Sequence, residues 1–167
     1  MSANPLEGIA MEDLVAIKGY ISEDYARLDA ALRRLDMTEL EELDAYIRVA
    51  THGMFQLPAY RGAVFRGATL SEAATANYVP GAVVREHSFV SAVANPAIQF
   101  PGNTTFVIAS INGREAWWLS DHPEEREVVF FTGTRFKVLD VEADTQTAHR
   151  TIYLAEIPDP RLFPPKR

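Results

Sequence analysis

Apolar residues recur at two different spacings along the chain, and the change of spacing divides it into two parts. Helical spacing links Leu14, Ile17, Tyr20 and Ile21, and after a polar break it links Tyr25, Leu28, Leu32 and Leu35. A third helix is predicted from Thr38, because Thr38-Glu39-Leu40-Glu41 has the form of a capping box, to about Gly53. The first part, residues 1–57, is therefore predicted to be helical.

After Pro58 the pattern changes to short runs of β-branched and aromatic residues, which are typical of strands. The predicted strands cover residues 63–66, 81–85, 88–93, 104–111, 116–119, 127–131, 135–141 and 151–157. Turn signals separate them, among them Pro80-Gly81, Pro101-Gly102-Asn103, Asn112-Gly113 and Thr132-Gly133-Thr134. Helices followed by strands predict an α+β fold with a β-rich core at 58–157 and a tail at 158–167.

Composition and charge narrow the class of protein. With 167 residues, 47% of them hydrophobic, the chain has the size and composition of one folded domain, and no repeat or linker stretch divides residues 1–167. A formal charge of −7 disfavours broad binding to nucleic acid. No apolar run approaches the roughly 20 residues that span a bilayer, and residues 1–7 lack a secretory signal pattern. We expect a soluble domain that uses another route if it is exported.

Several kinds of catalytic chemistry are disfavoured by what the sequence lacks. The absence of cysteine excludes disulfides, thiolate metal sites and cysteine nucleophiles. The chain has no Gly-x-Ser-x-Gly elbow, His-Glu-x-x-His pair, phosphate-binding loop or paired-glycine dinucleotide motif. The histidines His52, His87, His122 and His149 are far apart, and none has a partner at metal-ligand spacing. We expect no metal site.

Three short segments of the β-rich part carry the candidate chemistry. They are Val64-Phe65-Arg66-Gly67, then Ser88-Phe89-Val90-Ser91-Ala92-Val93, then Glu125-Arg126-Glu127 at the entrance of the apolar run 128–131. An acidic run alone is usually solvated surface, but in an extended segment Glu125 and Glu127 would point together and Arg126 away. In this order, and over nearly the whole chain, the segments resemble the Arg-Ser-Glu class of bacterial mono-ADP-ribosyltransferases.

The resemblance implies both a fold and a reaction. The fold would be that of an ADP-ribosyltransferase, in which N-terminal helices precede two packed antiparallel β-sheets with NAD in the cleft between them. Glu127 matches the catalytic glutamate, whose carboxylate stabilises the oxocarbenium-like ribose as nicotinamide leaves. Glu125 matches the carboxylate that prepares the nucleophile, and glutamate at that position implies arginine as the acceptor. NAD is then a co-substrate, and no metal is required.

Ser91 matches the first serine of the family's Ser-Thr-Ser element, whose hydroxyl orients the catalytic glutamate. The next two residues, Ala92 and Val93, depart from that pattern, and Val93 removes a hydroxyl that would help to hold the site. This departure places the detailed geometry of the serine strand in question and leaves Ser91 itself in place.

The arginine strand supplies the expected contacts to NAD. Arg66 matches the family arginine, whose guanidinium suits a phosphate because its fork matches the oxygens. We prefer it to Arg61 because Arg66 follows Val64-Phe65 and precedes Gly67 at the family distance from the serine strand. The resemblance implies that the backbone at Gly67 approaches the nicotinamide amide, and that Phe100 is the aromatic residue against the nicotinamide ring.

The acceptor is expected to be a protein that contacts the loop at residues 120–124. Trp117 and Trp118 precede this loop and, in a strand, would point to opposite faces, one toward the core and one toward the partner. Family members of this size are often the toxic end of a longer secreted protein or a translocated effector, which implies action in a target-cell cytoplasm and a neutralising partner protein.

Two other functions stay open from the sequence. In the first, water replaces the protein acceptor and the domain is an NAD glycohydrolase; Glu125→Ala would then distinguish the two, because it should abolish transfer and spare hydrolysis. In the second, the fold is a catalytically inactive binding module. Val93 gives that interpretation slight support, whereas retention of Arg66, Ser91, Glu125 and Glu127 speaks against it.

Overall fold

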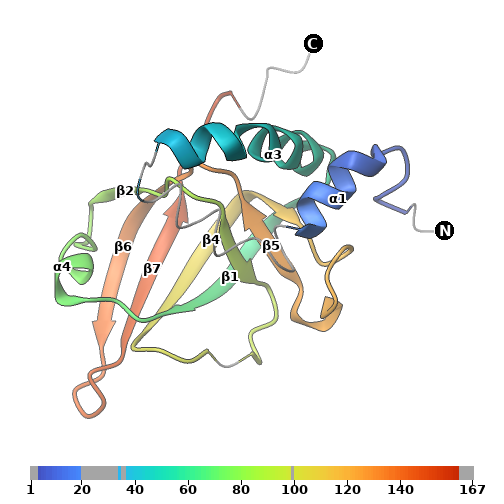
Figure 1. Cartoon of the computed structure of the whole chain (residues 1–167). Coiled ribbons are helices and arrows are strands. Elements are labelled where there is room, and N and C mark those ends of the chain that lie inside the picture. Colours follow the sequence, from blue (N-terminus) through green and yellow to red (C-terminus); the bar gives the residue numbers. More distant parts are fainter. Residues whose placement is uncertain (1–3, 20–33, 35–36, 99, 162–167) are drawn as a thin grey trace.

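The computed structural model describes residues 4–19, 34, 37–98 and 100–161. Two helices, α1 (Met11–Gly19) and α3 (Met37–Gln56), pack against each other above one end of a sheet (Figure 1). The helix predicted over residues 25–35 lies outside the described residues except at Arg34, which is helical. The helical N-terminal part is therefore confirmed for the elements that the structure describes.

Gly53 allows the two helices to approach closely. The helix was predicted to end near Gly53, and α3 ends close by at Gln56, so Gly53 lies within its last turn. A Cβ atom on Gly53 would lie 2.7 Å from Cδ1 of Ile17 and 2.9 Å from Cβ of Asp13, both on α1. The absence of a side chain serves contact between helices, which no local pattern along α3 could show.

Seven strands form one hydrogen-bonded sheet in the order β1-β3-β5-β4-β7-β6-β2. Their bounds are β1 (Ala59–Ala68), β2 (Val83–Arg85), β3 (Val90–Val93), β4 (Thr104–Glu115), β5 (Glu127–Phe130), β6 (Arg135–Ala143) and β7 (Arg150–Glu156). Short helices occupy two connections, α4 (Glu72–Thr75) and the 3-10 helix η2 (Pro123–Glu125). Among the pairings of these strands, β4–β7 is parallel and the others are antiparallel.

The α+β class with N-terminal helices and a mostly antiparallel sheet is confirmed, while the arrangement of the strands differs from two separate sheets. β1 pairs with β4 as well as with β3, so β1, β3, β5 and β4 form a closed set, and β4 continues the sheet to β7, β6 and β2. The long strand β4 thus joins two halves of one folded sheet, because its twelve residues are enough to pair with β1, β5 and β7.

Two local predictions are wrong. Residues 116–119 form a turn and not a strand, because the N–H of Leu119 bonds to the carbonyl of Ala116 at 3.0 Å. Asn112-Gly113 is not a turn but part of β4. Gly113 is needed there for packing, since a Cβ would lie 2.6 Å from Cγ1 of Val128.

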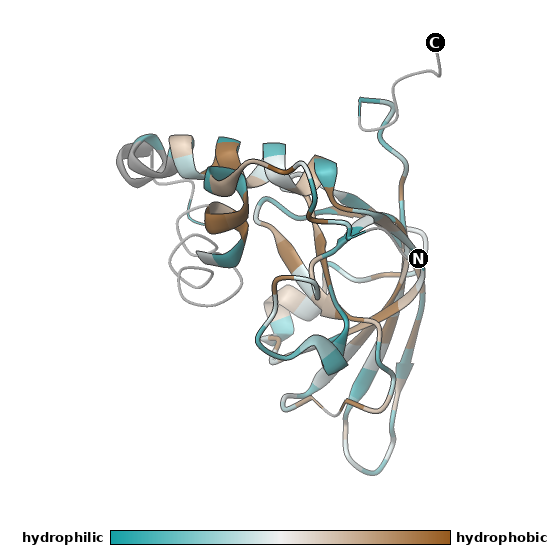
Figure 2. Ribbon diagram, turned by 90° about the vertical axis from the view of Figure 1, so that its right-hand side faces the viewer, coloured by the Kyte–Doolittle hydropathy of each residue, from teal (hydrophilic) through white to brown (hydrophobic). Residues whose placement is uncertain are grey.

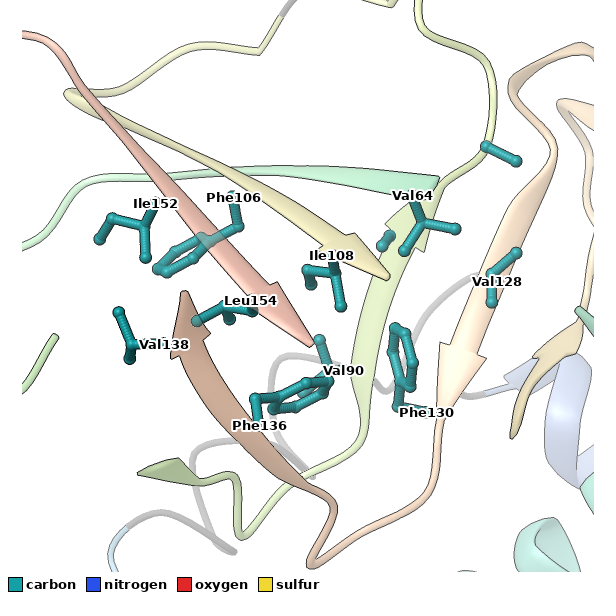
Figure 3. Packing of buried hydrophobic residues seen from close by; sticks show 12 residues of the cluster. Val64, Val90, Phe106, Ile108, Val128, Phe130, Phe136, Val138, Ile152 and Leu154 are labelled. Atoms are coloured by element: carbon teal, nitrogen blue, oxygen red, sulfur yellow. The ribbon is translucent and has the colours of Figure 1, made fainter. Parts of the chain in front are cut away.

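The core consists of two clusters on opposite faces of β3 and β5. The helix-side cluster lies beneath α1 and α3 and contains Ala16, Ile17, Ala50, Met54, Leu57, Phe89, Ala116, Val129 and Phe131. The sheet cluster contains Val64, Val90, Ala92, Ala94, Phe106, Ile108, Val128, Phe130, Phe136, Val138, Ile152 and Leu154, whose side chains converge from several strands (Figure 3). Hydrophobic residues run along the strands, as the brown segments of Figure 2 show. Side chains alternate between the two faces along β3 and β5, so these strands contribute residues to both clusters.

No helix in the described part of the chain has the length and hydrophobicity that crossing a bilayer would require.

Candidate active site

The centre of the candidate site is a pair of side chains on the adjacent strands β3 and β5. Ser91 lies opposite Val129, and Val93 lies opposite Glu127. Because side chains alternate along a strand, Ser91, Val93 and Glu127 share the face that carries the helix-side cluster. The hydroxyl of Ser91 donates a hydrogen bond to Oε1 of Glu127. The serine therefore holds the carboxylate in one orientation.

The environment of Glu127 raises its pKa above the ordinary value. Burial is the largest cause, and the negative charge of Glu125 adds to it, whereas the hydrogen bond from Ser91 and the positive charge of Lys18 lower the pKa. Desolvation thus outweighs the two groups that favour the ionised form. A perturbed, partly buried carboxyl group of this kind is characteristic of functional sites.

Val93 explains part of this environment. It lies directly opposite Glu127 across the strand pair, and the residue is only 7% exposed. A valine offers the carboxylate an apolar wall where a serine would offer a hydrogen bond. The departure from the family pattern therefore leaves Ser91 as the β3 hydroxyl that bonds to Glu127, and it contributes apolar surroundings to a group whose pKa burial already raises.

Glu125 lies at the end of η2 and not in an extended segment. The N–H groups of Glu125 and Arg126 bond back to the carbonyls of His122 and Pro123, both at 3.1 Å, and wind the chain into a 3-10 turn. The predicted extended geometry is therefore wrong, because the proline-initiated turn precedes the strand. The two carboxylates still interact, since the charge of Glu125 raises the pKa of Glu127.

Arg126 links the turn to the strand in an unusual conformation. Its φ of 56° and ψ of 62° are left-handed, which costs a residue other than glycine roughly 1–3 kcal/mol. Its guanidinium carbon lies 5.0 Å from the ring centroid of Trp117 and 5.7 Å from that of Tyr60. Both distances are within the range of cation–π attraction, which offsets part of the backbone cost.

Two residues that the sequence did not single out hold the loop before Glu127. Asn95, which follows β3, donates its amide Nδ2 to the carbonyl of Glu124 at 3.0 Å, and its N–H bonds to the carbonyl of Glu125. Lys18 at the end of α1 forms an ion pair of 2.6 Å with Asp121 and lowers the pKa of that carboxyl. The Asn-Pro pair at 95–96 was a detectable turn signal, whereas nothing local connects Lys18 with Asp121.

Arg66 lies on the face of β1 that is opposite to the face shared by Ser91 and Glu127. It pairs with Phe106 of β4 and lines a cavity of about 360 Å³ together with Tyr78, Glu86 and Phe136. Among the described residues its guanidinium has no ion-pair or hydrogen-bond partner. The structure therefore does not bring Arg66 into contact with Ser91 and Glu127, and it leaves a cation available in a neighbouring cavity.

Gly67 and Phe100 meet at the end of β1. Phe65 pairs with Val93, so Gly67, two residues further along β1, shares the face of Ser91. A Cβ on Gly67 would overlap Cβ of Phe100, lie 2.9 Å from its Cγ and lie 3.1 Å from the carbonyl of Pro101. The structure thus brings this aromatic residue against the glycine. Arg61, the alternative arginine, is exposed beside a register shift in β1.

The two tryptophans do not point to opposite faces, because they lie in the turn at 116–119. Their rings stack with centroids 6.1 Å apart and planes inclined by 29°. Trp117 is partly buried, while Trp118 is 44% exposed and donates its Nε1–H to Glu115 at 3.2 Å. Trp118 and the exposed residues 121–124 therefore lie at the surface next to the site.

Three histidines of the described chain have side-chain hydrogen-bond partners, and of these His122 lies at the start of the turn that carries Glu125. His52 bonds to Asp13, His149 to the hydroxyl of Thr105, and His122 to Glu124. No group of three or more histidine, aspartate or glutamate side chains gathers as a metal site within the residues that the structure describes.

Comparison with known proteins agrees with this geometry. The sequence profile described as NAD:arginine ADP-ribosyltransferase matches residues 4–160. The chain is 34% identical over 158 residues to a putative NAD(+)--arginine ADP-ribosyltransferase, Mav, of Mycobacterium avium, covering 91% of this chain and 19% of that protein. It is 34% identical over 132 residues to the NAD(+)--protein-arginine ADP-ribosyltransferase Tre1 of Pseudomonas putida, covering 77% of this chain and 26% of the relative. The chain thus spans about a fifth to a quarter of the length of these curated relatives.

A solved structure shares the fold. The ADP-ribosyltransferase Vis of Vibrio splendidus, in complex with agmatine, superposes with a TM-score of 0.78 over 93% of this chain and 79% of that one, at 19% identity. The family profile, the two relatives and the shared fold all agree with the resemblance drawn from the three short segments. This chain belongs to the NAD:arginine ADP-ribosyltransferase family.

Proposed function

We propose that this domain cleaves the bond between nicotinamide and ribose in NAD and transfers ADP-ribose to an arginine side chain of a target protein. The observation that carries the proposal is the hydrogen bond from Ser91 to Glu127, which orients a partly buried carboxylate. Glu125 lies on the adjoining turn, close enough for its charge to affect Glu127. One face of β3 and β5 thus supplies a group for the donor, and the turn supplies one for the acceptor.

The residues around this pair fit NAD. Gly67 has no side chain, so Phe100 packs closely against it and would offer an aromatic surface to the nicotinamide ring. Arg66, the residue before Gly67, has no ion-pair or hydrogen-bond partner among the residues that the structure describes, and its guanidinium would hold a phosphate through parallel N–H donors. We further propose that NAD lies between the two halves of the folded sheet, at the end of β1.

Each residue then has a defined role in the reaction. The ribose develops positive charge as nicotinamide leaves, and an ionised Glu127 stabilises that charge. Ser91 orients this carboxylate and favours its ionised form, as does the charge of Lys18. Glu125 would accept hydrogen bonds from the incoming guanidinium and direct its nitrogen to the ribose.

The names of the relatives support arginine as the acceptor. Tre1 is named as a protein-arginine ADP-ribosyltransferase, and Vis was solved with agmatine, a small molecule that carries a guanidinium group. A guanidinium acceptor is chemically suited to Glu125, because a carboxylate can accept two parallel N–H bonds. We therefore include agmatine as an acceptor in the test.

The test measures nicotinamide release from NAD by the wild-type domain and by Glu127→Gln, each with and without agmatine or a cell lysate. We expect release to rise with an acceptor, ADP-ribose to appear on it, and Glu127→Gln to lower release by about 10³-fold. Glu142→Gln, an exposed glutamate on β6, serves as the control. Release that does not depend on Glu127, or no release in any condition, would contradict the proposal, and the latter result would favour a binding module.

An NAD glycohydrolase is the second candidate, because Glu125 is only partly covered and water can reach the turn. Glu125→Ala separates the two functions. In a transferase it abolishes labelling of agmatine and protein while nicotinamide release into water persists. In a glycohydrolase the wild type itself releases nicotinamide at a rate that acceptors do not change.

We also propose that the domain is the toxic part of a larger secreted or translocated protein. The support is that the chain spans only 19% and 26% of its longer relatives. Expression of the wild-type domain in a host cell should then slow growth, whereas Glu127→Gln should not. Equal growth of both strains at matched protein levels would contradict this part of the proposal.

A further inference from the structure

Arg126 lies between the two glutamates of the candidate site in the chain, and its side chain contacts the rings of Trp117 and Tyr60. It is one of two residues other than glycine with positive φ in the described chain, the other being Ala148 in the β6–β7 loop. Glu125 before it belongs to η2, and Glu127 after it begins β5. The dihedral angles of Arg126 therefore decide how the two carboxylates are directed relative to each other.

The side chain of Arg126 rests on an aromatic shelf formed by Tyr60 and Trp117. Its guanidinium carbon lies 5.0 Å from the Trp117 ring centroid and 5.7 Å from that of Tyr60, and these two rings meet edge to face at 6.1 Å. Trp118 stacks on Trp117. The shelf joins β1 and the turn at 116–119 to the residue between the glutamates, although these segments are far apart in sequence.

The backbone of Arg126 is held from a second direction. Its carbonyl accepts the N–H of Ala94 at 2.9 Å, and its own N–H bonds to the carbonyl of Pro123. These bonds hold the backbone of Arg126 to the residue after β3 and to the turn, while the aromatic shelf holds its side chain. A left-handed residue that is anchored at both the backbone and the side chain cannot relax without breaking one set of contacts.

We infer that Arg126 is a positioning residue, which through its contact with Trp117 and Tyr60 directs Glu125 toward the acceptor and so sets the partition of ADP-ribose between arginine and water. This inference rests on the proposed function. Glu127 is held by Ser91 and by the strand, so loss of the contacts of Arg126 with Trp117 and Tyr60 displaces Glu125 more than Glu127. The expected signature is a loss of transfer with hydrolysis retained.

The kinetic test compares Arg126→Ala, Arg126→Lys and the control Arg61→Ala, whose arginine is exposed on β1. Rates of agmatine labelling and of NAD hydrolysis are measured for each. Arg126→Ala should lower transfer by about ten- to a hundredfold, the range that small misplacement of a reacting group produces, and change hydrolysis little. Arg126→Lys should recover part of the transfer rate, because lysine retains the cation. Arg61→Ala should match the wild type.

Trp117→Leu tests the shelf from the other side. It should produce the same loss of transfer as Arg126→Ala. The double variant Arg126→Ala/Trp117→Leu should lose no more transfer than either single variant, because both substitutions remove the same contact between Arg126 and Trp117. Equal losses of transfer and hydrolysis in Arg126→Ala, or unchanged transfer, would overturn the inference. So would additive losses in the double variant.

Tryptophan fluorescence gives a readout that does not depend on activity. The chain has two tryptophans, Trp117 and Trp118, and both are at this shelf. Arg126→Ala should uncover Trp117, so acrylamide should quench the emission more strongly than in the wild type, and Arg126→Lys should lie between them. Unchanged quenching would overturn the inference even if the wild type is active. A wild type that transfers nothing, with quenching changed as expected, would refute the proposed reaction and confirm the contacts of Arg126 with the shelf alone.

Discussion

Glu127 and Glu125 are two residues apart, yet the structure holds them in different ways. Glu127 begins a strand, bonds to Ser91 and has a pKa raised mainly by burial. Glu125 ends a 3-10 turn in a mostly exposed loop that Lys18, Asn95 and Arg126 attach to the rest of the domain. The group for the donor is thus built into the sheet, and the group for the acceptor is carried on a tethered loop.

The difference agrees with the two halves of the proposed reaction. Stabilising charge on the ribose requires a carboxylate with one orientation and little water around it, which a packed strand provides. Receiving the arginine of another protein requires an accessible surface, which a loop provides. Single substitutions can weaken the strand that holds Glu127, the loop that carries Glu125, and the electrostatic interaction between the two carboxylates.

The largest effect is expected from Ser91→Ala, which removes the hydrogen bond that orients Glu127. Hydrolysis and transfer should both fall by about a hundredfold, because both use the same carboxylate. Rates of nicotinamide release and of agmatine labelling measure the two reactions. Ser88→Ala is the matched control, since the buried hydroxyl of Ser88 has no hydrogen-bond partner among the described residues. A selective loss of transfer would contradict the division between strand and loop.

Asn95→Ala should affect the loop side alone. It removes the amide that bonds to the carbonyl of Glu124, and it loosens the turn that carries Glu125. Transfer to agmatine should fall by about tenfold while hydrolysis changes little. Asn77→Ala, an exposed asparagine after α4, should match the wild type. A larger loss of hydrolysis than of transfer would show that Asn95 supports Glu127 instead.

Gly67→Ala tests the donor side from β1. The added methyl group would overlap Phe100 and approach the carbonyl of Pro101, an overpacking that costs about 1–3 kcal/mol. If Phe100 lies against nicotinamide, the KM for NAD should rise by about tenfold. The KM for agmatine, measured at saturating NAD, is the internal control and should not change. An unchanged KM for NAD would remove Phe100 from the donor site.

The smallest effects concern pH. Because the pKa of Glu127 is raised, and its ionised form is the active one, kcat/KM for hydrolysis should be lost as the pH falls through a value above that of an ordinary glutamate. Glu125→Gln removes a negative charge that raises this pKa, so the acid limb should move to lower pH. Lys18→Met removes a positive charge that lowers it, so the limb should move to higher pH.

Lys137→Met, on the exposed side of β6, is the control for the second shift. Shifts in the same direction for Glu125→Gln and Lys18→Met would contradict the link between the loop and the strand. An acid limb that neither change moves would show that Glu127 is not the titrating group.

Much of the fold could be predicted from the sequence because the local patterns agreed with the final structure. The strand runs before and after Glu127 were found at nearly their observed places, since alternation and turn residues are local signals. The runs at 116–119 and 112–113 were misjudged, because an apolar turn and a packing glycine look the same in sequence as a strand and a turn glycine. Which one forms depends on what packs against it.

In the candidate site, too, some features could be predicted from the sequence and others could not. Ser91 and Glu127 were predicted together, and the structure joins them by a hydrogen bond. Arg66 was predicted to hold a phosphate of NAD, which stays a prediction, and the structure places it in a cavity on the face of β1 opposite to Gly67, because neighbouring strands set which way each residue points. Asn95 and Lys18 were missed because each acts through the loop: Asn95-Pro96 signals a turn but not its contact with Glu124, and nothing local connects Lys18 with Asp121.

By itself the sequence determined the α+β class, the order of the three motif segments and the chemistry that those residue types allow. These properties depend on spacing and on side-chain type, which are local. The tertiary structure alone decided the left-handed conformation of Arg126, its contact with Trp117 and the ion pair that joins Lys18 to Asp121 across 103 positions of the chain. Such contacts form only when distant segments pack, and they fix how Glu125 is oriented relative to Glu127, its near neighbour in the chain.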